Sequence, residues 1–139
     1  MSLLVDTNVL SEVRKGARAN PNVRSWLEAL EDGDIFISAL SLGELRRGVE
    51  SIRKKDGSQA ASLERWLNRL ATTHASRIVP IDVRVAEAWG RLMATRTGSL
   101  VDTLLAATAL VHGLVLVTRN VKDVAWTGVT YLDPFEPPA

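Results

Sequence analysis

Short aliphatic runs alternate along this chain with longer segments of helical periodicity. The runs that predict buried strands are 3–5, 35–37, 78–81, 114–117 and 129–132. Between them, apolar residues recur at i, i+3, i+4 and i+7, for example at Val23, Trp26, Leu27 and Leu30, which predicts helices with one buried face. Strands that alternate with helices predict a three-layer α/β/α fold around a central parallel sheet of four to five strands.

Polar residues mark where the predicted helices begin and end. Asn20 followed by Pro21 predicts a helix start, because Asn accepts a hydrogen bond from a free backbone N–H and Pro is tolerated at the first helical position. Asp82 is expected to cap a helix that turns Val85, Ala86, Trp89, Leu92 and Met93 inward. Ser99 opens an almost uncharged helix that ends at Gly113, so this helix should be central to the fold.

Length and composition predict one domain over residues 1–139, with 133–139 as a C-terminal tail. The 17 basic and 16 acidic residues nearly cancel, so binding to nucleic acid would depend on local charge. The absence of cysteine excludes disulfides and thiolate metal sites. Only two histidines are present, so a metal would be bound by oxygen ligands. No apolar run approaches the length of a membrane span, and we expect a cytoplasmic protein.

Three acidic residues stand out by their position. Asp6 ends the first strand, Glu44 lies in the first turns of the helix after the second strand, and Asp102 lies in the first turn of the apolar helix. In a parallel sheet, the carboxyl ends of the strands and the helix starts that follow them share one edge, so these side chains can meet in one crevice. Clustered carboxylates repel one another unless a cation neutralises them, and such a set suits Mg²⁺ or Mn²⁺.

Each acid also has a structural explanation. Asp6 could cap a short helix that extends to about Arg14. The helix after the second strand opens at Ser38 or Ser41, and both Ser41–Glu44 and Ser99–Asp102 match a capping box, in which the third helical residue bonds back to the cap N–H. Convergence of all three acids on one sheet edge favours the functional interpretation.

The chain resembles the PIN-domain ribonucleases, specifically the VapC-type toxins of bacterial toxin–antitoxin pairs. The matching stretches are residues 4–12, 37–45, 102–109 and 117–123, in the family's order and spacing. The resemblance implies that Asp6, Glu44 and Asp102 are catalytic acids that bind Mg²⁺, or alternatively Mn²⁺. It also implies that Asn8 and Thr118 support them.

The chain departs from the family pattern after the fourth strand. Asn120 stands where the family often has an Asp, and Asp123 follows three residues later. Either Asp123 completes the acidic set, with Asn120 in a supporting role, or Asp123 is a surface charge. Arg119 lies beside the predicted site and is our candidate for a contact with a substrate phosphate.

The predicted function is therefore metal-dependent endoribonuclease activity on RNA phosphodiester bonds, as the toxin of a toxin–antitoxin pair. The resemblance further implies a homodimer and inhibition by a VapB-type antitoxin. One alternative is a catalytically weak PIN-like module that binds RNA or an antitoxin. Another is a haloacid-dehalogenase-like phosphatase, because Asp6 ends a first strand as that family's nucleophile does.

Overall fold

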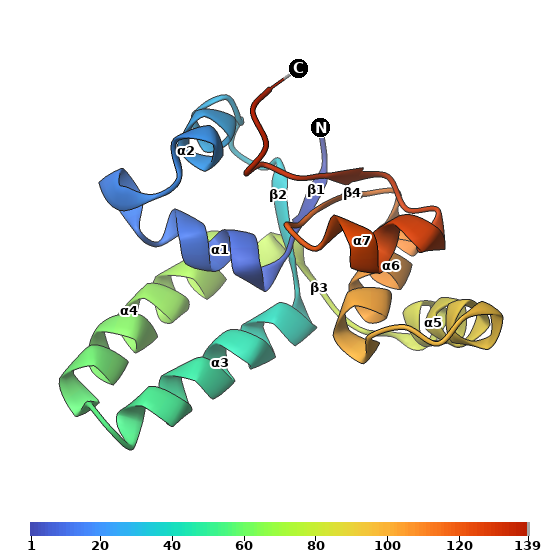
Figure 1. The fold of residues 1–139 in the computed structure, drawn as a ribbon. Coiled ribbons are helices and arrows are strands. Elements are labelled where there is room, and N and C mark those ends of the chain that lie inside the picture. The colour runs from blue at the N-terminus through green and yellow to red at the C-terminus, as the bar shows by residue number, and fades with distance from the viewer. Residues whose placement is uncertain (139) are drawn as a thin grey trace.

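We describe the fold from a computed structural model of the chain, which covers residues 1–138 (Figure 1). The strands are β1 (Leu3–Val5), β2 (Ile35–Ser38), β3 (Ile78–Val79), β4 (Val115–Val117) and β5 (Tyr131–Leu132). The helices are α1 (Thr7–Val13), α2 (Pro21–Glu28), α3 (Ala39–Arg53), α4 (Gly57–Thr73), α5 (Val83–Thr95), α6 (Leu100–His112) and α7 (Val121–Val124). Single 3₁₀ turns occupy Gly16–Arg18, Ala75–Arg77 and Ala125–Thr127.

The five strands form one parallel sheet in the order β3-β2-β1-β4-β5, which confirms the predicted fold class. Strand β1 is central, and Leu3 pairs with Ile35 on one side and with Val115 on the other. All strands run in one direction, so their carboxyl ends lie at the same edge of the sheet. Helices α1 and α3 start at this edge (Figure 1).

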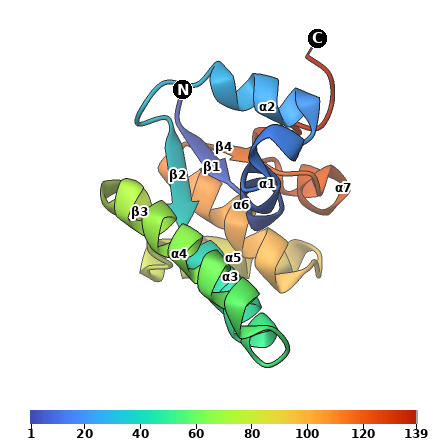
Figure 2. The same ribbon diagram turned by 90° about the vertical axis from the view of Figure 1, so that its left-hand side faces the viewer.

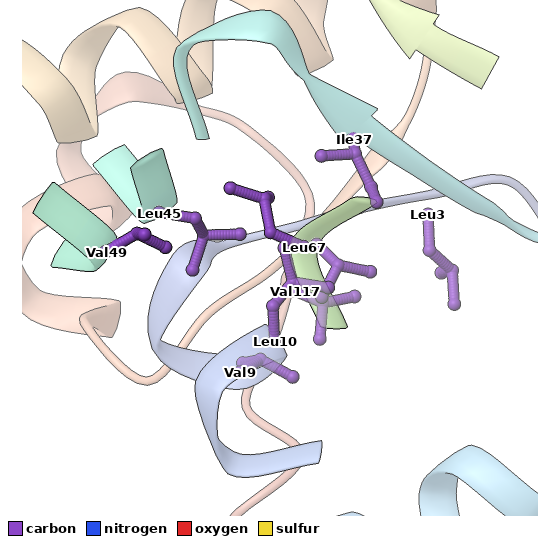
Figure 3. Packing of buried hydrophobic residues seen from close by; sticks show 9 residues of the cluster. Leu3, Val9, Leu10, Ile37, Leu45, Val49, Leu67 and Val117 are labelled. Carbon is purple, nitrogen blue, oxygen red and sulfur yellow. The ribbon is translucent and has the colours of Figure 1, made fainter. Parts of the chain in front are cut away.

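Both faces of the sheet are covered by helices. Alternate residues of β1 point to opposite faces, so they pack against different helices. Leu3 and Val5 pack with residues of α1, α3 and α4 in the core cluster shown in Figure 3. Leu4 packs on the other face, against Leu105 and Ala106 of α6. The near absence of charge in α6 is thereby explained, since this helix covers the sheet directly.

Helices α3 and α4 form a hairpin on one side of the sheet (Figure 2). Glu64 of α4 accepts hydrogen bonds from both Arg46 and Arg53 of α3, and Glu50 pairs with the same two arginines. These ion pairs raise the pKa of each guanidinium and lower that of Glu64. Arg46 and Arg53 therefore tie the hairpin together.

Several predicted element boundaries are confirmed. Asn20 Oδ1 accepts hydrogen bonds from the N–H groups of Asn22 and Val23, and Asp82 Oδ1 accepts one from Val85 N. Gly113 ends α6 with φ = 64°, a left-handed conformation that favours glycine.

Other local predictions were wrong. The third and fifth strands are only two residues long, so Pro80 and Val129 lie outside the ladder. Ala86 is exposed rather than turned inward with Val85. Of the two predicted starts of α3, Ser38 is correct, because its Oγ accepts a hydrogen bond from Leu40 N, and Ser41 lies inside the helix. The predicted Ser41–Glu44 capping box is therefore absent.

Within residues 1–138, no helix has both the length and the apolar character needed to cross a membrane.

Candidate functional site

Asp6 is a buried carboxylate at the end of the central strand, with 4% of its surface exposed. It occupies the N-cap position of α1, and its backbone carbonyl accepts hydrogen bonds from Val9 N and Leu10 N. Its side chain makes no capping hydrogen bond, so a capping role does not explain the carboxylate. Instead, Oδ2 accepts hydrogen bonds from Thr118 Oγ1 at 2.7 Å and from Asn8 Nδ2 at 3.3 Å. Among residues 1–138, no side chain donates to Oδ1.

Burial raises the pKa of Asp6 above its ordinary value, because desolvation disfavours the charged form. The hydrogen bonds from the Thr118 hydroxyl and the Thr7 backbone lower it only in part. The negative charges of Asp102 and Glu44 raise the pKa of Asp6 further. The charges of Asp102 and Glu44 therefore reach Asp6, although their effect on its pKa is smaller than that of burial.

Glu44 is held by a residue that the sequence analysis did not assign to the site. Thr7 Oγ1, at the first position of α1, donates a 2.8 Å hydrogen bond to Glu44 Oε1 in α3. Thr7 directly follows Asp6, so one short segment supplies both an acid and the donor that orients a second acid. No local pattern could reveal this contact, because 37 residues separate its two partners.

Asp102 lies in the first turn of α6, half-buried. Ser99 Oγ accepts a 3.4 Å hydrogen bond from Asp102 N, as predicted for the helix cap. The reciprocal bond of a capping box, from Ser99 N to the Asp102 carboxylate, does not form within the described part of the chain. The carboxylate of Asp102 is thus not used by its own helix start.

The turn after β4 connects the site to a further strand of the sheet. Thr118 is fully buried, and its Oγ1 accepts a 3.0 Å hydrogen bond from Asn120 N while donating to Asp6. Arg119 N donates to Asn8 Oδ1 at 3.4 Å. Asn8 and Thr118 therefore both contact Asp6, whereas Asn120 contributes its backbone and leaves its side chain exposed.

Asp123 lies in the first turn of α7 and is exposed. Its backbone N–H donates to Asn120 O, and its carbonyl accepts a 3.0 Å hydrogen bond from Trp126 Nε1. Its carboxylate takes part in none of the hydrogen bonds among residues 1–138. Among the four predicted acids, Asp102 and Glu44 influence the charge of Asp6, whereas Asp123 lies at the surface and contributes no such effect.

The donor chemistry at this site fits a hard divalent cation. The side chains present carboxylate, amide and hydroxyl oxygens, and the buried charge of Asp6 lacks a cationic side-chain partner among residues 1–138. No three acidic or histidine side chains of the described chain are close enough to form a ready-made metal group. Mg²⁺ retains several waters and often binds only one or two carboxylates, so the arrangement remains suitable.

An open hollow of about 510 Å³ lies beside Glu44. Its lining consists of Ala39, Leu40, Gly43, Glu44, Arg47, Ile81 and Val101. Glu44 is therefore open to solvent on this side, whereas Asp6 and Asp102 do not line the hollow.

Residues 3–122 match the family model of the PIN domain. The chain is 28% identical to the VapC ribonuclease Y4jK of Sinorhizobium fredii, over 97% of this chain and 99% of the relative. It is 30% identical to the toxin FitB of Neisseria gonorrhoeae, over 96% and 98%.

Solved structures agree with these sequence matches. The crystal structure of FitAcB from Neisseria gonorrhoeae superimposes with a TM-score of 0.85 at 30% identity, over 96% of this chain and 99% of that one. A toxin–antitoxin complex from Klebsiella pneumoniae gives 0.72 at 28% identity, over 97% and 99%. The matched segment includes Asp6, Glu44, Asp102 and Thr118, and the protein belongs to the PIN domain family.

Proposed function

We propose that this protein is a metal-dependent endoribonuclease that acts as the toxin of a toxin–antitoxin pair. The observation that carries the proposal is the environment of Asp6, a buried carboxylate with two hydrogen-bond donors and two further acids close by. Its relatives named VapC ribonuclease and FitB toxin support the same activity.

In this proposal, Asp6, Glu44 and Asp102 hold Mg²⁺ or Mn²⁺, directly or through water. When bound, the cation supplies positive charge that activates water as a nucleophile and stabilises charge on the phosphate. Thr118 and Asn8 orient Asp6 through Oδ2, and Thr7 orients Glu44. We assign the exposed residues Asp123 and Asn120 to the rim of the site, where Asp123 would contact the cation through water.

We test the activity with purified protein, structured RNA and Mg²⁺ or Mn²⁺. Asp6→Asn and Asp102→Asn should each reduce cleavage by roughly 100-fold or more, since each removes a charge that holds the cation. Asp32→Asn is the matched control, because Asp32 is an exposed acid outside the site. Cleavage by either site variant at the wild-type rate would refute the assignment.

A second candidate is a PIN module that binds RNA or an antitoxin without cleaving RNA. Within residues 1–138, no three acidic or histidine side chains are grouped so that they could bind one metal ion, and this favours the binding module. Calorimetry separates the two candidates: Mn²⁺ binding that is lost in Asp6→Asn supports the nuclease. No Mn²⁺ binding, combined with retained RNA binding, supports the module. The match to the PIN domain model argues against the alternative of a haloacid-dehalogenase-like phosphatase.

We further propose a VapB-type antitoxin as the protein partner, and a homodimer as the state of the toxin. The solved relatives include toxin–antitoxin complexes, and a FitAB structure is bound to a DNA fragment. Exposed apolar side chains suitable for such interfaces are Ile81, Val83 and Leu100, of which Val83 is 73% exposed. Co-purification with the product of a neighbouring short reading frame would test the antitoxin, and light scattering would test the dimer.

A further inference from the structure

Arg119 is an exposed cation beside the most buried part of the site. It directly follows Thr118, and its backbone N–H bonds to Asn8, the residue that donates to Asp6. The backbone at Arg119 is thus tied into the hydrogen-bond network of Asp6. The charged side chain of Arg119 is therefore attached one residue after Thr118, the buried donor to Asp6.

The guanidinium of Arg119 lies over the ring of Phe135, 4.3 Å from the ring centroid. Phe135 belongs to the C-terminal segment and is itself well fixed. Asn22 Nδ2 donates a 2.8 Å hydrogen bond to Phe135 O, and Phe135 N donates a 2.9 Å bond to Asp133 Oδ1. Phe135 also packs against the core cluster that contains Val9 and Leu10 of α1. Stacking on this ring limits the orientations that the guanidinium can adopt.

Arg119 acts on an acid of the described chain only at longer range, where its charge contributes to the lowered pKa of Glu12. Arg46 and Arg53 are committed to glutamates, but Arg119 forms none of the ion pairs among residues 1–138. Glu12, an acid on α1, instead bonds to Lys15 Nζ and Asn20 N, both at 2.9 Å. The N–H donors of Arg119 therefore remain available to an anionic ligand.

We propose that Arg119, stacked on Phe135, forms a binding subsite for a phosphate of the RNA, and that Phe135 is a positioning residue that acts through Arg119. A planar guanidinium can hold two phosphate oxygens at once, and stacking presents it in one orientation. The C-terminal segment 133–138 is then part of the substrate site. This inference rests on the proposed function, because it takes RNA as the ligand.

Binding of a single-stranded RNA oligonucleotide to the full chain is measured by fluorescence anisotropy in EDTA, where cleavage is prevented. Arg119→Gln should weaken binding roughly tenfold at low salt. It should also reduce the slope of log K against log salt by about 0.7, which corresponds to one lost phosphate contact on a single strand. Arg69→Gln, an exposed arginine on α4, removes the same charge and should leave both values unchanged.

The role of Phe135 is tested by a double-mutant cycle. Phe135→Leu keeps an apolar side chain but removes the aromatic face, and should weaken RNA binding about three- to fivefold. In the Arg119→Gln background the same change should have no further effect, because Phe135 acts only through the guanidinium. Phe135→Trp keeps an aromatic face and should bind RNA as tightly as the wild-type chain. If only packing mattered, the larger Trp side chain would weaken binding instead. Thermal melting of each variant verifies the fold.

The two proposals can fail separately. If the wild-type chain cleaves RNA while Arg119→Gln has an unchanged KM and an unchanged salt slope, the phosphate subsite is wrong and the nuclease assignment stands. If the chain binds RNA through Arg119 but never cleaves it with Mg²⁺ or Mn²⁺, the subsite stands and the nuclease assignment fails. Equal effects of Phe135→Leu with and without Arg119 would overturn the positioning role.

Discussion

Thr118 donates a 2.7 Å hydrogen bond to Asp6 across 112 residues of sequence, and the two residues directly follow the neighbouring strands β4 and β1. Both residues are buried, so water cannot replace the bond if it is lost. The same hydroxyl accepts from Asn120 N and so connects Asp6 to the turn that carries Arg119. The central acid of the site is therefore oriented from β4 as well as from its own segment.

Thr118→Val removes this donor while keeping the shape of the side chain. We expect a loss of about 1.5–3 kcal/mol in the free energy of unfolding at neutral pH, because a buried charged acceptor loses its strongest partner. Urea unfolding measures the loss. Thr72→Val provides the control, since its exposed hydroxyl bonds only to Asn68 O and the change should stay within about 0.5 kcal/mol. Equal stability of Thr118→Val and wild type would contradict this prediction.

Asp6→Asn should stabilise the protein in the absence of divalent cations. Burial raises the pKa of Asp6 in the folded state, so the charged carboxylate weakens folding at any pH above that pKa. The penalty shrinks as the pH falls below the folded pKa, and it is gone below the lower pKa of the unfolded chain, where both states are protonated. Melting temperatures in EDTA should therefore be higher for Asp6→Asn at neutral pH, and the gain should shrink on acidification. A gain that does not depend on pH would exclude this explanation.

Divalent cations should reverse that order of stability. Mn²⁺ at about 100 times its Kd should stabilise the wild-type chain by about 2.7 kcal/mol, because it binds only the folded state. Asp6→Asn and Asp102→Asn should show a smaller effect, and Asp32→Asn should match wild type. Melting curves with and without Mn²⁺ provide the measurement. An identical shift in all four proteins would place the ion elsewhere.

Thr7→Val should lower kcat roughly tenfold, since Glu44 loses the donor that orients its carboxylate. Thr7→Ser keeps the hydroxyl and should retain most of the activity. Rates of RNA cleavage at saturating substrate separate this effect from weaker binding. If Thr7→Ser were as impaired as Thr7→Val, the methyl group rather than the hydrogen bond would be the important feature.

Gly98 and Gly48 should respond to alanine in opposite ways. A Cβ at Gly98 would lie 2.8 Å from Trp126 Cζ2 and 2.9 Å from Thr103 Oγ1, so Gly98→Ala should cost about 1–3 kcal/mol of stability. A Cβ at Gly48, inside α3, meets no atom within 4 Å. Gly48→Ala should therefore stabilise the protein by up to about 1 kcal/mol, through its better helix propensity. Urea unfolding of both variants tests the pair.

The sequence by itself determined the features that depend on neighbouring residues. Buried runs such as 3–5 and the caps at Asn20 and Asp82 were correctly predicted, because strand alternation and helix capping involve residues at most four positions apart. The near absence of charge in α6 likewise indicated its central place. The order of strands with helices between them was enough to predict the parallel sheet.

The tertiary structure decided what the same residues do once the chain is folded. Asp6 and Glu44 both fit local capping roles, yet neither side chain caps its helix, and Glu44 accepts a hydrogen bond from Thr7 in another element instead. The contacts of Thr118 with Asp6 and of Arg119 with Phe135 also join distant segments. Such pairs leave no trace in spacing or periodicity, because their partners meet only when the sheet and its covering helices pack.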